Sequence, residues 1–253
     1  MAIRNLDDWY PETLRLTVFP IIGTQIDPQE TFKQIAGIPV DELKSDREIG
    51  QTTILGRNDN LVLQLVVQPD RIHWAMTSMK DRPSTDPRES SLGNFPEAIT
   101  KFQPLVQEWL KSELCPELIR IAFGVILLSP VENEIDGFSR LSEYIQSLDI
   151  DPHNVSDLMY QINRWRVSKT GNPGIKLNRL NKWSVSVHQV VGFQLGGVRL
   201  NPLLGERNFA IKLELDINTD QSNENSISKD RYRPILNELI ELAVEIVEEG
   251  DVQ

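Results

Sequence analysis

The sequence predicts an α+β protein built from tandem duplicated β-α-β-β-β-α units, with largely antiparallel sheets and helices packed on one face. The first observation is a run of three strand-like segments, 51–57, 61–68 and 71–78, separated by short polar turns. The second is a strand pattern that returns 105 residues later, and the third is an apolar helical stripe that returns 138 residues later. We therefore expect a first unit at 1–112 and a second at 113–253.

The leading strands of the two units carry the strongest evidence for the duplication. Segments 12–19 and 117–126 both begin with glutamate and both carry an arginine three residues later, Arg15 and Arg120. A helix is expected after each strand. The first begins at Asp27-Pro28, because Asp is a good N-cap and Pro fits the first helical position, and it ends near Gly37. The second spans 136–148.

Each unit is expected to end in an amphipathic helix, at 95–111 and at 232–249. The apolar residues recur every three or four positions, as they do on one face of a helix. Pro104 lies inside the first of these helices and is expected to kink or split it. The matching stripe positions are Ala98, Phe102, Leu105 and Trp109 in the first helix and Leu236, Ile240, Ala243 and Val247 in the second.

The second unit is longer than the first, and the difference between the two offsets places the extra residues before its strands. We expect those strands at 183–191, 193–200 and 209–218, and an inserted helix and loop at about 149–182. Within the insertion, 155–167 is expected to be helical, with Met159, Ile162 and Trp165 on its packed side. Whether the two units share one core is left open.

Composition and charge limit the classes of function. The chain has a net charge of −11, which opposes non-specific binding to nucleic acid or to an anionic membrane surface. Its longest apolar run is far shorter than the roughly 20 residues that span a bilayer. The first residues lack the pattern of a secretory signal, so we expect a cytoplasmic location. The single cysteine, Cys115, is expected to have a packing role.

Two resemblances cover most of the chain. The string Arg-Ile-Ala-Phe-Gly at 120–124 and the acidic final helix resemble a large, patchily distributed and uncharacterised prokaryotic family of about this length. The element order is similar to that of the TATA-box-binding-protein-like saddle folds. Those proteins bind DNA through a basic concave face, and this acidic chain departs from that pattern. Neither resemblance implies a role for any particular residue.

The insertion at 149–182 is the main candidate for binding a partner. Its net charge is +3, which leaves −14 for the rest of the chain, and it carries a tryptophan between two arginines. Such a basic, aromatic segment suits a phosphate backbone, a base or an acidic protein. The alternative, which we favour for Trp165, is a helix that packs this tryptophan inward and leaves its arginines in solvent. The candidate partner-binding residues are Arg164, Trp165, Arg166, Lys169, Lys176, Arg179 and Lys182.

Other local patterns are weaker. Residues 216–220 alternate oxygen-bearing side chains as a calcium loop does, but Gln221 stands where that loop needs glycine, so a strand end is expected. The glycines of 192–197 are expected to form a hairpin or bulge rather than a phosphate loop. We expect no catalytic residue, metal ligand or cofactor site.

The leading hypothesis is a non-enzymatic subunit or adaptor that binds another protein, encoded nearby, in a bacterial defence or toxin-neutralising system. It depends on an acidic scaffold, the basic insertion and two long loops, 80–94 and 168–182. One alternative is nucleic-acid binding through the insertion, which the net charge disfavours. Another is an enzyme without a local motif. A homodimer through the final helix is possible, but we expect its apolar stripe to cover the sheet instead.

Overall fold

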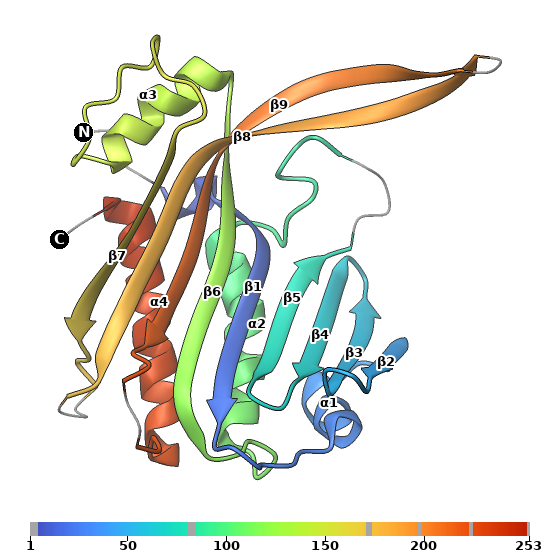
Figure 1. Cartoon of the computed structure of the whole chain (residues 1–253), viewed down its shortest axis with the longest axis vertical. Helices are drawn as coiled ribbons and strands as arrows, with labels where there is room; N and C mark the ends of the chain where they lie inside the picture. The colour runs from blue at the N-terminus through green and yellow to red at the C-terminus, as the bar shows by residue number, and fades with distance from the viewer. Residues whose placement is uncertain (1–4, 80–83, 171–173, 197–198, 223–224, 252–253) are drawn as a thin grey trace.

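A computed structural model describes residues 5–79, 84–170, 174–196, 199–222 and 225–251, excluding the side chains of 190–204 and 206. Within these residues, nine strands form one antiparallel sheet in the order β2-β3-β4-β5-β1-β6-β9-β8-β7 (Figure 1). The strands are β1 (Tyr10–Pro20), β2 (Glu42–Asp46), β3 (Gln51–Asn58), β4 (Leu61–Val67), β5 (Ile72–Ser78), β6 (Leu118–Val131), β7 (Met159–Val167), β8 (Lys176–Gly196) and β9 (Arg199–Thr219). The helices are α1 (Pro28–Ala36), α2 (Phe95–Lys111), α3 (Glu134–Tyr144) and α4 (Tyr232–Glu249), with short 3₁₀ turns at Leu6–Asp8 and Lys229–Arg231.

The predicted α+β class and antiparallel pairing are confirmed. The predicted leading strands are β1 and β6, which lie side by side at the centre of the sheet, with Leu16 opposite Phe123. The three predicted strands of the first unit are β3, β4 and β5, and β5 pairs with β1. One strand was not predicted: β2 is short and polar, so its sequence lacks the apolar alternation of a buried strand.

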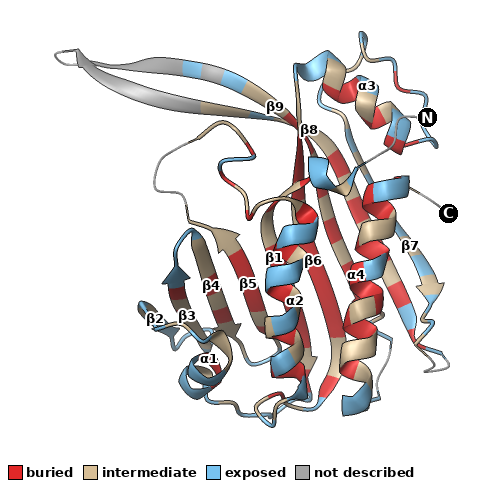
Figure 2. Cartoon of the chain, turned by 180° about the vertical axis from the view of Figure 1, so that it is seen from behind, coloured by how far each residue is buried: buried red, intermediate tan, exposed pale blue. Residues whose placement is uncertain are grey.

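All four helices of the described chain pack on the same face of this sheet. Figure 2 shows α1, α2 and α4 in front of it. On that face, Tyr144 at the end of α3 stacks on Trp183 of β8, with ring centroids 5.1 Å apart. The start of α1 is as predicted, because the Asp27 side chain accepts hydrogen bonds from the backbone amides of Gln29 and Glu30, and Gly37 ends the helix at φ +64°. Pro104 lies within one helical element, α2, and does not split it.

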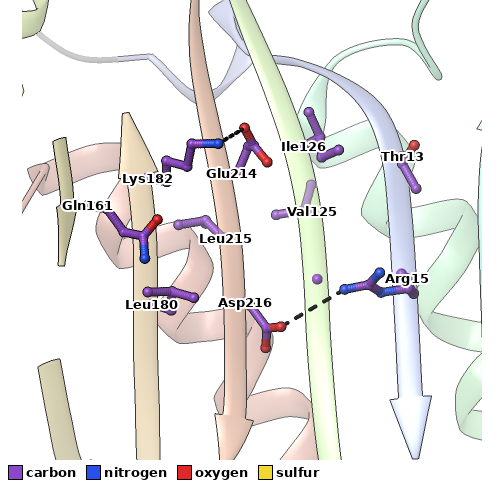
Figure 3. A pocket seen from close by; sticks show the side chains of 11 residues that line it. Thr13, Arg15, Val125, Ile126, Gln161, Leu180, Lys182, Glu214, Leu215 and Asp216 are labelled. Atoms are coloured by element: carbon purple, nitrogen blue, oxygen red, sulfur yellow. Dashed lines mark hydrogen bonds and ion pairs between the residues drawn. The ribbon is translucent and has the colours of Figure 1, made fainter. Parts of the chain in front are cut away.

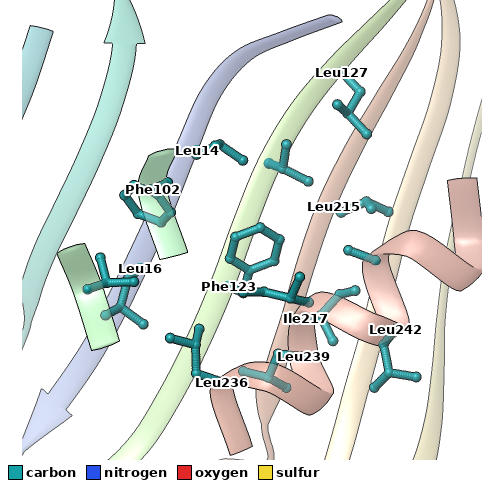
Figure 4. Close-up of a cluster of buried hydrophobic side chains, with 14 of the residues drawn as sticks. Leu14, Leu16, Phe102, Phe123, Leu127, Leu215, Ile217, Leu236, Leu239 and Leu242 are labelled. Atoms are coloured by element: carbon teal, nitrogen blue, oxygen red, sulfur yellow. The ribbon is translucent and has the colours of Figure 1, made fainter. Parts of the chain in front are cut away.

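The core lies between the sheet and the helices. Alternate residues of β1, β6 and β9 point toward α2 and α4, as Figure 4 shows for Leu16, Phe123, Ile217 and others. The stripe of α4 is buried along its length, so this helix covers the sheet, as the sequence suggested. Of the five tryptophans, four are no more than 1% exposed, whereas Trp165 is 63% exposed.

The helix expected at 155–167 is wrong. Residues Met159–Val167 form β7, an edge strand whose side chains alternate between exposed and half-buried positions. The spacing of Met159, Ile162 and Trp165 suggested a helix, but a strand lets β7 complete its pairing with β8 from Met159–Ser184 to Val167–Lys176. Tertiary pairing overrides the weak helical signal here.

The expected break between a strand at 183–191 and another at 193–200 is also wrong. The backbone of β8 runs without a break from Lys176 to Gly196, with a register shift between Gln189 and Val191. Its pairing with β9 continues beyond the part of β9 that pairs with β6, so the two strands project from the sheet as an arm (Figure 1). The connection at 197–198 and the loop residues 80–83 and 171–173 lie outside the described residues.

Candidate interaction surface

The sheet face opposite the helices, which we call the open face, is not covered by any described helix. Side chains alternate in a strand, so the residues between the core positions of β1, β6, β9, β8 and β7 point to this face. One row across it runs through Arg15, Gly124, Asp216, Leu180 and Asn163, which are successive partners in the registers of these strands. The sheet therefore brings together charged residues far apart in sequence.

Arg15 and Asp216 are the register partners of Gly124 on its two sides, and Figure 3 shows their side chains directed toward each other. The Arg15 Nη2 and Asp216 Oδ2 atoms are 4.0 Å apart, and both side chains are more than one-third exposed. A Cβ atom on Gly124 would lie 3.1 Å from Arg15 Nη2, so the glycine gives the guanidinium room to cross the strand. A hollow of about 370 Å³ lies at this point.

A second charged pair lines the same hollow. Lys182 of β8 donates a hydrogen bond to Glu214 of β9 at 3.0 Å, and Lys212 lies 3.2 Å from the same carboxylate. Partial burial alone would raise the pKa of Glu214, but the hydrogen bonds from Lys182 and Lys212 outweigh it and lower the pKa. The hollow is thus lined by both cations and carboxylates.

A neighbouring hollow of about 520 Å³ shares Asp216 with the first. The Arg120 guanidinium lies 4.7 Å from the centre of the Phe19 ring, and its Nε donates to the carbonyl of Thr219 at 2.9 Å. Burial lowers the pKa of Arg120. Arg120 is therefore held by β1 and β9, and it is a less adaptable contact than Arg15.

His73 is a further polar residue of this face. Its Nδ1 lies 2.8 Å from the Thr17 hydroxyl on the adjacent strand. Burial, together with the positive charges of Arg15 and Arg71, lowers the pKa of His73 to about 4. The ring is consequently neutral at physiological pH.

The arginines expected to bind a partner lie on the helix side of the sheet. Arg164 forms an ion pair with Asp251 at 2.8 Å. Arg166 and Arg179 both bind the carboxylate of Glu245 on α4, at 3.1 and 3.0 Å. Their guanidinium groups hold β7 and β8 against α4 and the residues after it. The arginines on which the nucleic-acid alternative depends are therefore paired with carboxylates of the same chain.

The remaining expected residues point outward. Trp165 lies on the open face at the edge of the sheet, with Lys176 Nζ 4.9 Å from its ring centre. Lys169 is exposed just after β7, and Lys182 lines the central hollow. The structure therefore brings Trp165 and Lys176 together and places Lys182 nearer to Glu214 and Asp216, residues that were not predicted as sites.

Other patterns from the sequence have structural explanations. Asp216 and Asn218 belong to β9, and Asn218 accepts a hydrogen bond from Arg120 at 2.8 Å. No cluster of three potential metal ligands is found among the residues that the structure describes. Cys115 is buried in the core, and burial raises the pKa of its thiol to about 12. It packs as expected.

Comparison with known proteins gives no family. No family model matches the chain, and no curated protein matches it. Across the described ranges, none of the helices is long and apolar enough to cross a membrane.

Proposed function

We propose that this protein is a non-enzymatic interaction subunit that binds another protein across the open face of its sheet. One observation carries the proposal: the helices cover one face, while the other presents partly exposed charged side chains around a hollow at its centre. A functional surface on a rigid sheet is well placed for recognition, because the strands fix the spacing of its side chains.

The chemistry of the hollow favours a protein partner over nucleic acid. Arg15 and Lys182 are balanced there by Glu214 and Asp216. A phosphate backbone would be attracted by the cations and repelled by the carboxylates, whereas a protein surface can complement both. The partner that fits carries acidic and basic side chains at matching positions.

We further infer that the two halves arose by tandem duplication. Around the β1–β6 pair the sheet order is similar on both sides, since β5 flanks β1 just as β9 flanks β6, and β2 is the one strand without a counterpart among the described residues. At the predicted offset of 105 residues, Ala122 corresponds to Thr17, and these two residues lie directly opposite each other in the sheet. An approximate two-fold axis through this pair would relate the leading strands, as in the saddle folds whose element order the chain resembles.

The pathway is proposed from the resemblance alone. The patchy distribution of the similar prokaryotic family suggests a partner encoded by a neighbouring gene, as in bacterial defence or toxin-neutralising systems. An enzyme of unknown class is the alternative, and the residues that line the central hollow include no recognised catalytic combination that would favour it.

The test is recovery of a partner from native cells with matched charge reversals. Wild-type protein and Lys111→Glu, which changes an exposed residue of α2, are expected to recover the same protein at the endogenous level. Arg15→Glu makes the same kind of change in the hollow and is expected to lose it. Equal recovery with both variants, or recovery of no partner in repeated experiments, would refute the proposal.

A further inference from the structure

The two edges of the sheet differ in how they are protected against pairing with another strand. At one edge, β2 has only five residues, and Glu42, Lys44 and Asp46 place alternating charges along it. Short length and charge are the usual protection of an edge strand. At the other edge, β7 has nine residues, and its side chains on the open face are all exposed and uncharged: Met159, Gln161, Asn163, Trp165 and Val167.

The outer backbone edge of β7 is open to a further strand. Within the described ranges, β7 pairs with β8 alone, and no other backbone hydrogen bond reaches it. Figure 1 shows β7 as the outermost strand on its side of the sheet. The strand is also held in place, because Arg164 and Arg166 bind carboxylates on the helix side. A rigid strand of this kind is a template for strand addition.

We propose that β7 pairs antiparallel with β7 of a second copy of this chain, about a two-fold axis at Asn163. Asn163 is the middle residue of Met159–Val167, so this register is the one in which all nine residues of both strands are paired. Met159 then lies opposite Val167 of the second copy. Trp165 lies opposite Gln161, so the apolar side chains of the two copies meet at each end of the contact on the open face, on either side of the Asn163 pair.

The charges flanking β7 favour a second copy as the occupant. Asp157 lies two residues before the strand and Lys169 two residues after it, and both are exposed. In the register centred on Asn163, Asp157 of each copy lies at the same end of the contact as Lys169 of the other. Each end of the symmetrical contact therefore carries one carboxylate and one ammonium group.

The helix side of the contact is compatible with the same register. Arg164 would lie opposite Ile162, and Arg166 opposite Tyr160, so no two like charges are directly opposed. The edge is thus complementary to its own copy on both faces of the sheet.

This inference does not rest on the proposed function, because it concerns the edge of the sheet and not the central hollow. An antiparallel strand pair has its two-fold axis perpendicular to the sheet, which places both open faces on the same side. The dimer would present a doubled open face to its partners.

Disulfide cross-linking tests the register directly. Opposed residues in an antiparallel pair have Cα atoms about 4.5–5.5 Å apart, within the range of a disulfide. In purified full-length protein, Asn163→Cys is therefore expected to give a covalent dimer under mild oxidation. Gln161→Cys is the control, because its counterpart would be four residues away along the strand, about 13 Å. The native Cys115 is buried, with 4% exposure, so the wild type is expected not to cross-link and serves as the negative control.

A charge exchange tests the contact without a cross-link. Asp157→Lys and Lys169→Asp each replace two attractions with two repulsions, and each is expected to weaken the dimer about tenfold in sedimentation equilibrium. The double variant Asp157→Lys/Lys169→Asp should restore the wild-type constant. Circular dichroism would verify that every variant is folded. A monomer at all concentrations, cross-linking at Gln161→Cys but not at Asn163→Cys, or no restoration in the double variant would overturn the proposal.

Discussion

The guanidinium of Arg164 donates two hydrogen bonds to the carboxylate of Asp251, at 2.8 and 2.9 Å. Arg164 belongs to the edge strand β7, and Asp251 lies just after α4, so this pair ties the edge of the sheet to the end of the last helix. The side chain of Asp251 is fully buried, whereas that of Arg164 is 26% exposed. Tyr160 on the same strand also donates a hydrogen bond to this carboxylate.

Asp251→Asn is expected to lower the free energy of unfolding by about 2 kcal/mol, because it removes the charge that neutralises Arg164. Burial alone would raise the pKa of Asp251, but the hydrogen bonds from Arg164 and Tyr160 outweigh it and lower the pKa. The contribution is therefore present above pH 4 and is lost at lower pH, as the folded protein takes up the proton. Urea unfolding at pH 7 measures the change. Glu249→Gln, at an exposed neighbouring position, should change stability by less than about 0.5 kcal/mol.

Glu245→Gln is expected to destabilise the protein more than an equivalent change elsewhere on α4. Glu245 accepts hydrogen bonds from both Arg166 and Arg179, and Arg179 is only 4% exposed. Without the carboxylate, a buried guanidinium loses its counter-charge, at a cost of about 3 kcal/mol. Thermal and urea unfolding would measure it. Glu241→Gln, one helical turn earlier and exposed, is the matched control, and equal effects of the two changes would contradict this account.

The sequence predicts helices more accurately than it predicts the edge of the sheet. The bounds of α2 and α4 agree with the predicted 95–111 and 232–249, because their apolar stripes are long and regular. The strand β7 was missed, since Met159, Ile162 and Trp165 match a helical spacing and its arginines look solvated. Only the structure supplies Asp251 and Glu245 as partners on the helix side.

The candidate site was harder to predict than the fold. Arg15, Gly124 and Asp216 lie on three different strands, and they meet because β6 is placed between β1 and β9. Alternation within each strand indicates which residues point away from the core, and in 209–218 it indicates Lys212, Glu214 and Asp216. It does not indicate which strands are neighbours, and that order determines the hollow.

Gly56→Ala is expected to destabilise the protein by about 2 kcal/mol, because the added methyl group meets atoms that cannot move aside. A Cβ at Gly56 would lie 2.6 Å from the backbone oxygen of Pro39 and 2.9 Å from Phe32 Cζ. Gly124→Ala is the comparison, since its Cβ would meet only the flexible Arg15 side chain, at 3.1 Å. We expect its cost to be below about 1 kcal/mol. Urea unfolding of the two variants measures both costs, and a larger loss for Gly124→Ala would contradict this explanation.

His73 is expected to make the folded state less stable as the pH falls from about 6.5 toward 4. Its pKa is about 4 in the folded protein, compared with 6.5 for the unperturbed side chain, because of burial and the nearby charges of Arg15 and Arg71. Between these values the unfolded chain binds a proton that the folded protein does not, so unfolding becomes more favourable as acid is added. Allowing for water around the partly exposed ring, we expect a loss of about 1–2 kcal/mol.

The measurement is the free energy of unfolding in urea at several pH values, for the wild type and for His73→Gln. Glutamine retains a group that can hydrogen-bond to Thr17 but does not titrate, so this component of the pH dependence should disappear. The carboxylates titrate in both proteins and cancel in the comparison. Parallel stability curves for the two proteins between pH 4 and 6.5 would show that protonation of His73 is not resisted by its neighbours on the open face.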